Sequence, residues 1–252
     1  MTRNAMFAAA AMVSFWFVAV GGALDAVAQQ DKKGDKKDDK KPKLNKPFDI
    51  DELGKKVFHI KFPANEKATI RIKSSDESDV DLFVEEMDGT EIVNDIADSK
   101  DCVVEFTPLK EKTYRISVVN LGPGGNRCTL THTGKEEKID FGKIAQTKPV
   151  DIAENGTHTI NVKLPEGKWA AVWVNGEKTT DVDVFVFDPE GNEIAKDEHL
   201  SKDAFASFMP KAAGVYKIEV RNLGEGDNTC VVKHTTLEDA KKPEPKKDTP
   251  KK

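Results

Sequence analysis

Hydrophobic and polar residues alternate along most of the chain between residues 48 and 237. Phe58, Ile60 and Phe62 occupy every second position of one segment, and Ile70 and Ile72 continue the alternation in the next. A period of two is the period of a β-strand, whose side chains point to opposite faces in turn. No helical period persists for ten residues, so the sequence predicts an all-β protein. The same alternation recurs in four further segments, at 80–84, 102–106, 114–118 and 128–130.

The chain repeats itself at an offset of 102 residues without a gap. Asp79–Val84 aligns with Asp181–Val186, and Asn120–Cys128 aligns with Asn222–Cys230. Of the 86 aligned pairs that start at residue 48, 32 are identical. An ungapped repeat of this length indicates that a whole domain was duplicated.

The duplication and the strand pattern together give a domain organisation. Several short strands with one polar face each are typical of antiparallel β-sandwiches and jelly rolls. We therefore predict two tandem, jelly-roll-like β-sandwich domains, at 48–136 (copy one) and 150–237 (copy two), joined by a connector at 137–149.

The motifs of the repeat resemble those of a known family. Between residues 79 and 120 the order is Asp-x-Asp-Leu-Phe-Val, Asp-Gly, Phe-Thr-Pro and Thr-Tyr-x-Ile-x-Val-x-Asn. This order resembles the bacterial pre-peptidase C-terminal domain, and the resemblance covers both copies. It implies calcium-tolerant β-sandwiches of the kind appended to secreted peptidases, similar to the collagen-binding modules of clostridial collagenases. Because this chain carries no peptidase domain, the resemblance implies a free-standing binding or envelope role.

Residues 1–28 have the layout of a secretory signal peptide. Arg3 precedes an apolar run, Gly21 interrupts it, and Ala26–Ala28 supplies small residues at the spacing of a cleavage site. Cleavage before Gln29 is the favoured interpretation, and an uncleaved anchor of about 20 residues is the alternative. We expect a secreted, periplasmic or cell-envelope protein with no membrane span after signal cleavage.

Two lysine-rich segments flank an acidic body. Residues 29–47 carry a net charge of +4 and residues 238–252 one of +2, which leaves −11 for residues 48–237 out of the total of −5. Both segments have too little apolar surface to offset the entropy lost on ordering, so we predict a disordered linker and a disordered tail. Their lysines suit anionic envelope polymers, although a solvated spacer is the favoured reading. The mild overall acidity argues against a nucleic-acid binder, so we expect no nucleic-acid partner.

The sequence contains no catalytic motif that we can identify. It has no metalloprotease helix motif, no nucleophile elbow and no phosphate-binding loop before a helix. The repeat-equivalent His132 and His234 are expected to point to solvent from the last strand of each copy. We predict that the protein is not an enzyme and has no catalytic residues.

Paired aspartates at one strand start in each copy are candidate metal ligands. Asp79 and Asp81 share one face of a predicted strand, and Asp181 and Asp183 do so in copy two. Carboxylate oxygens suit a hard cation, which makes Ca²⁺ the candidate cofactor, although it needs six to eight oxygens. The alternative is that these acids decorate a strand edge and prevent sheet-to-sheet pairing.

The three cysteines are too few for a disulfide scaffold. Cys128 and Cys230 are repeat equivalents, whereas Cys102 occurs in copy one only. Free buried thiols are the favoured interpretation, and a Cys102–Cys128 bridge is the alternative.

Copy two carries aromatic residues where copy one carries charges. Trp169, Trp173, Phe185 and Phe187 all take the outward phase of two successive strands, where copy one has a single aromatic residue. If those strands are neighbours, the four residues form an exposed aromatic face, which is typical of binding surfaces for a sugar ring or a protein. The alternative is a face covered by copy one or by the connector.

The sequence therefore favours an exported, non-catalytic binding or adhesion module. It would contact an extracellular polymer or protein through its β-sandwich surfaces, with Trp169, Trp173, Phe185 and Phe187 as the ligand-binding residues. The alternative is a structural or accessory scaffold, calcium-stabilised, for a separately encoded secreted enzyme.

Overall fold

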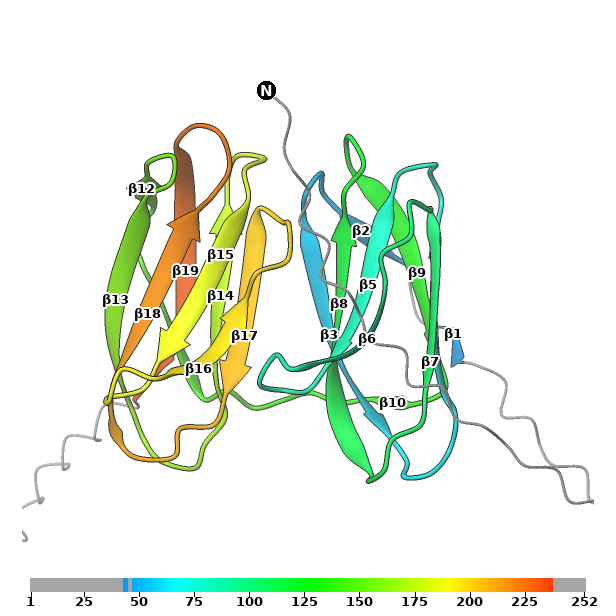
Figure 1. Cartoon of the computed structure of the whole chain (residues 1–252), viewed down its shortest axis with the longest axis horizontal. Helices are drawn as coiled ribbons and strands as arrows, with labels where there is room; N and C mark the ends of the chain where they lie inside the picture. Colours follow the sequence, from blue (N-terminus) through cyan, green and yellow to red (C-terminus); the bar gives the residue numbers. More distant parts are fainter. Residues whose placement is uncertain (1–42, 45–46, 238–252) are drawn as a thin grey trace, which may run out of the picture. The chain divides into compact units, whose positions relative to one another are not determined.

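The computed structural model describes residues 43–44 and 47–237, and this part of the chain is all β (Figure 1). Its strands form four sheets, and the strand pairs of the described residues are all antiparallel. The predicted all-β fold class is confirmed. In the described ranges, no helix is long and apolar enough to span a membrane. The predicted signal peptide and tail lie outside the described residues, as does most of the predicted linker.

Copy one contains two sheets that face each other across a hydrophobic core. Sheet A has the strand order β1-β9-β4-β7, with β2 also paired to β9, and sheet B has the order β10-β3-β8-β5-β6. The strands are β1 (Lys43–Leu44), β2 (Phe48–Ile50), β3 (Lys55–Phe62), β4 (Ala68–Ser74), β5 (Val80–Glu85), β6 (Glu91–Asp95), β7 (Asp101–Phe106), β8 (Lys112–Asn120), β9 (Asn126–His132) and β10 (Lys135–Glu136).

Copy two repeats this arrangement. Sheet C has the order β11-β19-β14-β17, with β12 also paired to β19, and sheet D has the order β13-β18-β15-β16. The strands are β11 (Lys143–Gln146), β12 (Val150–Ile152), β13 (Thr157–Leu164), β14 (Ala170–Gly176), β15 (Val182–Phe187), β16 (Glu193–Asp197), β17 (Asp203–Phe208), β18 (Gly214–Asn222) and β19 (Asn228–Thr236).

Each copy has its own hydrophobic core, made of the residues that the period of two turns inward. In copy one, Ile60 and Leu82 of sheet B pack with Ile70 and Ile72 of sheet A, and all four are at most 1% exposed. Copy two has a separate cluster built from the equivalent positions. Burial of these side chains stabilises each sandwich by about 1.5–3 kcal/mol per large residue. The alternation in the sequence therefore assigns the inward face correctly.

Glycines close the equivalent hairpins between β8 and β9 and between β18 and β19. Gly124 has φ of +78° and Gly226 has φ of +80°, a backbone region that residues with a Cβ rarely adopt. Asn120 and Asn222 support the same turns, since each side-chain amide donates to the carbonyl of that glycine, at 2.8 and 2.7 Å. The Gly-x-Gly segments at 122–124 and 224–226 therefore form equivalent hairpins in the two copies.

Two segments that were expected to be irregular contain strands. Lys43–Leu44 in the predicted linker pairs with β9, and Lys143–Gln146 in the predicted connector pairs with β19. The backbone hydrogen bonds of β11 extend sheet C, although the alternating pattern of the sequence is weak there. The connector thus belongs in part to the sheet of copy two.

The two copies also contact each other. The described residues all lie within one compact unit by Cα proximity, and β17 of copy two approaches β3 of copy one. Separate folding of 48–136 and 150–237 stays a prediction, because the described residues hold two cores within a single compact unit. The contacts between the copies include hydrogen bonds, ion pairs and contacts between rings.

Candidate functional site

The four predicted ligand-binding aromatic residues do not share a face. Trp173 lies in β14 of sheet C, and Trp169 directly precedes that strand. Phe185 and Phe187 lie in β15 of sheet D. The outer faces of two stacked sheets point in opposite directions. The condition for a four-aromatic patch, that the two strands are neighbours, is therefore not met, because successive strands here belong to different sheets.

Trp173 is packed against other rings. Its ring centroid lies 5.3 Å from that of Phe141, in the connector, and 5.4 Å from that of Phe205, on β17. The Phe205 backbone carbonyl in turn accepts a hydrogen bond from Arg115 of copy one at 2.9 Å. The connector and copy one therefore cover this part of sheet C, as the alternative interpretation of the aromatic face supposed.

Phe185 and Phe187 lie beneath cationic side chains of the neighbouring strand β18. The Arg221 guanidinium carbon is 4.0 Å from the Phe185 ring centroid, and the Lys217 ammonium is 4.2 Å from that of Phe187. Cation–π contacts of this kind are worth about 0.5–1 kcal/mol at exposed sites. The contacts already occupy the ring faces that a ligand would need.

Trp169 differs from the other three because it lines open space. It follows the β13–β14 turn, where Gly167 has φ of +71°, and its side chain is half-buried. The indole forms part of the wall of three hollows, with volumes of about 610, 340 and 460 Å³. An amphipathic ring placed in this way can offer a flat apolar surface to a ligand.

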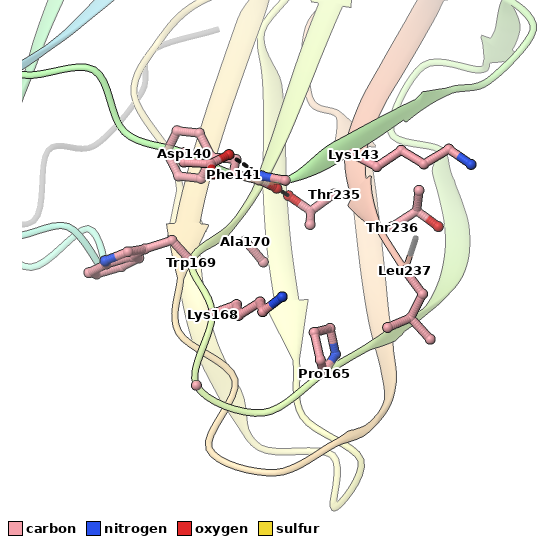
Figure 2. Close-up of a pocket in the computed structure, with 12 residues that line it drawn as sticks. Asp140, Phe141, Lys143, Pro165, Lys168, Trp169, Ala170, Thr235, Thr236 and Leu237 are labelled. Atoms are coloured by element: carbon pink, nitrogen blue, oxygen red, sulfur yellow. Dashed lines mark hydrogen bonds between the residues drawn. The ribbon is translucent and has the colours of Figure 1, made fainter. Parts of the chain in front are cut away.

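The largest of these three hollows is built from three segments of copy two and its connector (Figure 2). Asp140 and Phe141 precede β11, Pro165 and Lys168 belong to the β13–β14 turn, and Thr235 is the second-last residue of β19. The Asp140 carboxylate accepts from the Gly142 backbone N–H at 2.9 Å, and the Thr235 hydroxyl donates to the Phe141 carbonyl at 3.1 Å. The first bond shapes the turn of the connector, and the second holds the connector against β19 and fixes one wall of the hollow.

The hollow of about 460 Å³ is acidic. Carboxylates of Asp88, Asp188, Glu190 and Glu193 line it, with Lys211 as the single cation. The Asp188 carboxylate is used internally, since it accepts from the backbone N–H groups of Asn192 and Glu190 at 2.8 and 3.1 Å. Trp169 therefore stands between this acidic hollow and the larger one, which Lys143 and Lys168 line.

The paired aspartates do not converge on a common point with other ligands. Asp79 and Asp181 each accept a backbone N–H, from Ser99 at 3.0 Å and from Ser201 at 3.1 Å. Within residues 43–44 and 47–237, no group of three or more His, Cys, Asp or Glu side chains is placed to hold a metal ion. Calcium binding at these pairs has no support from this geometry and stays a sequence prediction.

Asp81 and Asp183 are buried, and the Oδ1 atom of each has no hydrogen-bond partner. Burial, followed by the charge of Asp79, raises the pKa of Asp81 to about 6. Burial, followed by the charge of Asp181, raises the pKa of Asp183 to about 7. Both carboxyls therefore bind a proton more readily than an exposed aspartate does, which disfavours the charged form a cation would need.

One of the two repeat-equivalent histidines is less exposed than the sequence suggested. His132 is 2% exposed, so the expectation that it points to solvent is wrong. The ring of His59 lies 5.9 Å from that of Phe205 and 5.7 Å from that of Phe141. Burial and the nearby Arg115 lower the pKa of His59 to about 4, so the ring is neutral near pH 7.

All three cysteines are free and buried.

A buried cluster of charged side chains joins the two copies. The Lys55 ammonium of β3 donates to Asp197 Oδ2, at the end of β16, at 2.5 Å, and both side chains are 2% exposed. The Arg115 guanidinium donates to Glu85 Oε2 at 2.8 Å within copy one. His199 contacts both pairs, with its Nδ1 2.6 Å from Asp197 Oδ1 and its Nε2 3.9 Å from Glu85 Oε1.

The pKa values in this cluster follow from the pairing. Burial alone would raise the pKa of Asp197, but Lys55 and His199 outweigh it and hold the pKa well below its ordinary value. Burial alone would lower the pKa of Arg115, but the Glu85 carboxylate outweighs it, so the pKa of Arg115 is raised. Charged partners within hydrogen-bond distance thus dominate over desolvation.

Sequence reasoning missed this cluster. Three members of the cluster have no charged or titratable residue at the equivalent position of the other copy. Lys55 aligns with Thr157, Glu85 with Phe187 and His199 with Ala97. That asymmetry is visible in the aligned repeat and could have indicated a surface used by one copy only. It could not have paired Lys55 with Asp197, which are 142 residues apart.

Comparison with known proteins identifies no family. No family model matches the chain, and no curated protein matches it. The structure is similar to the exported protein XepA of PBSX, with a TM-score of 0.29 and 13% identity over 77% of this chain and 85% of that one. The CBM22-1-CBM22-2 tandem domain of Xyn10C from Paenibacillus barcinonensis gives a TM-score of 0.23 and 10% identity over 69% and 79%. The major capsid protein P2 of bacteriophage PM2 gives 0.24 and 11% over 78% and 99%. At these TM-scores the similarities carry no argument about function.

Proposed function

We propose that the protein is an exported, non-catalytic binding module that contacts an extracellular polymer or protein through the surface around Trp169. The observation that carries the proposal is that this half-buried indole lines three hollows at once. The other three predicted aromatic residues have ring partners or cations against them. Trp169 is therefore the aromatic residue to which a ligand has access.

The chemistry around Trp169 suits a hydroxyl-rich ligand such as a polysaccharide. A sugar ring presents C–H groups to an indole face, and its hydroxyls need donors and acceptors at the edge. Lys143 and Lys168 on one side and Glu190 and Glu193 on the other provide both kinds. Export of the chain and its resemblance to the pre-peptidase C-terminal domain are consistent with such a partner and remain predictions from the sequence.

Co-sedimentation with insoluble polymers tests the proposal. The full chain and its Trp169→Ala variant would be mixed with chitin, cellulose, xylan, peptidoglycan and fibrillar collagen, and the bound fraction measured. We expect one of these to bind and the variant to bind about tenfold more weakly, equivalent to about 1.4 kcal/mol. Lys67→Ala is the matched control, because Lys67 is the repeat equivalent of Trp169. Equal binding by wild type and Trp169→Ala would refute the proposed surface.

Fluorescence gives a second measurement on the same samples. Trp169 and Trp173 are the tryptophans of the described residues. A ligand stacked on Trp169 should shift the emission to shorter wavelength in wild type and not in Trp169→Ala. Binding to collagen alone would favour a protein partner, and binding to a glycan alone would favour a polymer.

A further inference from the structure

We propose that Lys55 and Asp197 form an intramolecular amide bond that joins the two copies covalently. The two side chains meet at 2.5 Å between Lys55 Nζ and Asp197 Oδ2, and each is 2% exposed. Burial excludes water, which would otherwise hydrate the two charged groups and favour the separate ions over the amide. Holding an amine against a carboxyl in this way turns a slow bimolecular condensation into an intramolecular one.

The surroundings supply the groups that this condensation requires. The backbone N–H of Phe205 donates to Asp197 Oδ2 at 2.7 Å, where negative charge develops when the amine attacks the carboxyl carbon. His199 Nδ1 lies 3.4 Å from Lys55 Nζ and 2.6 Å from Asp197 Oδ1. One imidazole nitrogen therefore reaches both the nucleophile and the oxygen that must leave.

The ion pair itself is unreactive, because an ammonium has no free electron pair. His199 Nδ1 passes its proton to Asp197 Oδ1, 2.6 Å away, and in the same step takes up a proton from Lys55 Nζ, 3.4 Å away. The neutral amine then attacks the Asp197 carboxyl carbon and forms the C–N bond. The charged groups that face His199 are Lys55, Asp197 and Glu85, and the Asp81 carboxyl also interacts with it electrostatically.

The step balances without any other reactant. The ammonium begins with three protons and the carboxylate with two oxygens. One proton stays on nitrogen as the amide N–H, and two are carried to Oδ1, which leaves as water when the C–Oδ1 bond breaks. Oδ2 remains as the amide carbonyl and keeps the hydrogen bond from Phe205. No oxidation occurs and the net charge is unchanged.

Condensation also removes an electrostatic cost. Two opposite charges buried together lose their hydration, and their mutual attraction offsets that loss only in part. A neutral amide needs far less hydration than the two ions. The Arg115–Glu85 pair beside it stays charge-balanced on its own.

Copy one provides an internal control. Asp95 is the repeat equivalent of Asp197, and its carboxylate accepts the backbone N–H of Val103 at 2.8 Å, as Asp197 accepts that of Phe205. Alanine occupies position 97, the equivalent of His199. The acceptor carboxylate is therefore common to both copies, but the imidazole is found only in copy two.

Intact-mass spectrometry of the reduced and denatured full chain tests the proposal. We expect a mass lower by one water than the sequence that begins at the measured N-terminus. Peptide mapping should find a branched peptide that joins the segments containing Lys55 and Asp197. A mass equal to that of the unmodified sequence would overturn the proposal and leave the contact an ion pair only.

Variants separate this bond from other losses of water. Lys55→Arg keeps the positive charge but has no primary amine, so its measured mass should equal the mass calculated from its own sequence. Asp197→Ala lacks the carboxyl and should likewise show no loss of water. Asp95→Ala should keep the deficit. A deficit that persists in Lys55→Arg would overturn the proposal and point to succinimide formation at Asp88-Gly89. Circular dichroism would check that Lys55→Arg is folded, and the wild-type mass decides the question independently of any variant.

A final variant tests the role of His199. His199→Gln should form the bond at least tenfold more slowly than wild type when samples are taken over time after refolding. Equal rates would overturn the assignment of His199 as the proton carrier.

Discussion

The outer faces of sheets B and D occupy the same position in the repeat and have opposite surroundings. In sheet B the face carries Glu85 and Arg115, each 1% exposed and paired, and it contacts copy two. In sheet D the equivalent positions carry Phe187 and Lys217, and the lysine is 43% exposed over the ring. The difference shows that the residues on the outer face, not the strand framework, decide which face becomes an interface.

The largest expected effect comes from breaking the buried pair of sheet B. Arg115→Met leaves the Glu85 carboxylate buried without its cation, which should lower the free energy of unfolding by about 3–5 kcal/mol. Chemical denaturation would measure it. Lys217→Met, the equivalent change on sheet D, removes an exposed charge and should change stability by less than about 0.5 kcal/mol. Similar losses in both variants would contradict the comparison.

The stability of the protein should depend on pH through His59 of copy one. The equivalent residue of copy two, Asn161, does not titrate. The folded-state pKa of about 4 lies below the ordinary 6.5, so the unfolded chain binds a proton more readily. Stability should therefore fall as the pH drops from 6.5 to 4, by about 2–3 kcal/mol from this group. His59→Asn should flatten that part of the stability curve. An unchanged slope in the variant would show that His59 is not its source.

Asp183 should change the free energy of unfolding with pH by less than His59 does, and in the opposite direction. Its folded-state pKa of about 7 lies above the unfolded value near 3.8, so stability from this group is present at low pH and is lost as the pH rises towards 7. Asp183→Asn should raise the free energy of unfolding at pH 8 by about 2 kcal/mol, a value discounted for partial solvation.

Asp81→Asn in copy one is the matched change for Asp183. Its pKa of about 6 predicts a gain of about 1 kcal/mol at pH 8. Thermal unfolding at pH 5 and pH 8 would rank the two. A loss of stability in Asp183→Asn at pH 8 would mean that the carboxylate has a partner which the structure does not show.

The sequence predicted the strands well where the alternation was strong. Residues such as Ile60 and Ile72 have the period of two that a half-buried strand needs, and they lie in β3 and β4. The short strand β11 was not predicted, because its residues 143–146 are largely exposed and gain their structure from pairing with β19. Backbone pairing alone leaves little trace in hydropathy.

The candidate site was predicted only in part. Trp169 was identified from the aromatic asymmetry, but its separation from Phe185 was not, because the alternation shows which side chains face inward and not which sheet a strand joins. The hollows around Trp169 also depend on Phe141 and Thr235, which come from distant segments. Likewise, nothing local in the sequence brings Lys55 to Asp197.

The sequence by itself determined the all-β class, the duplication, the inward face of each strand and the acidic body between lysine-rich ends. All of these follow from local periodicity, turn chemistry and charge. The tertiary structure decided which sheet each strand joins, which aromatic residue keeps an open face and which charges meet in the interior. These depend on contacts between residues far apart in the chain, and burial, by removing water, sets how strongly those charges interact.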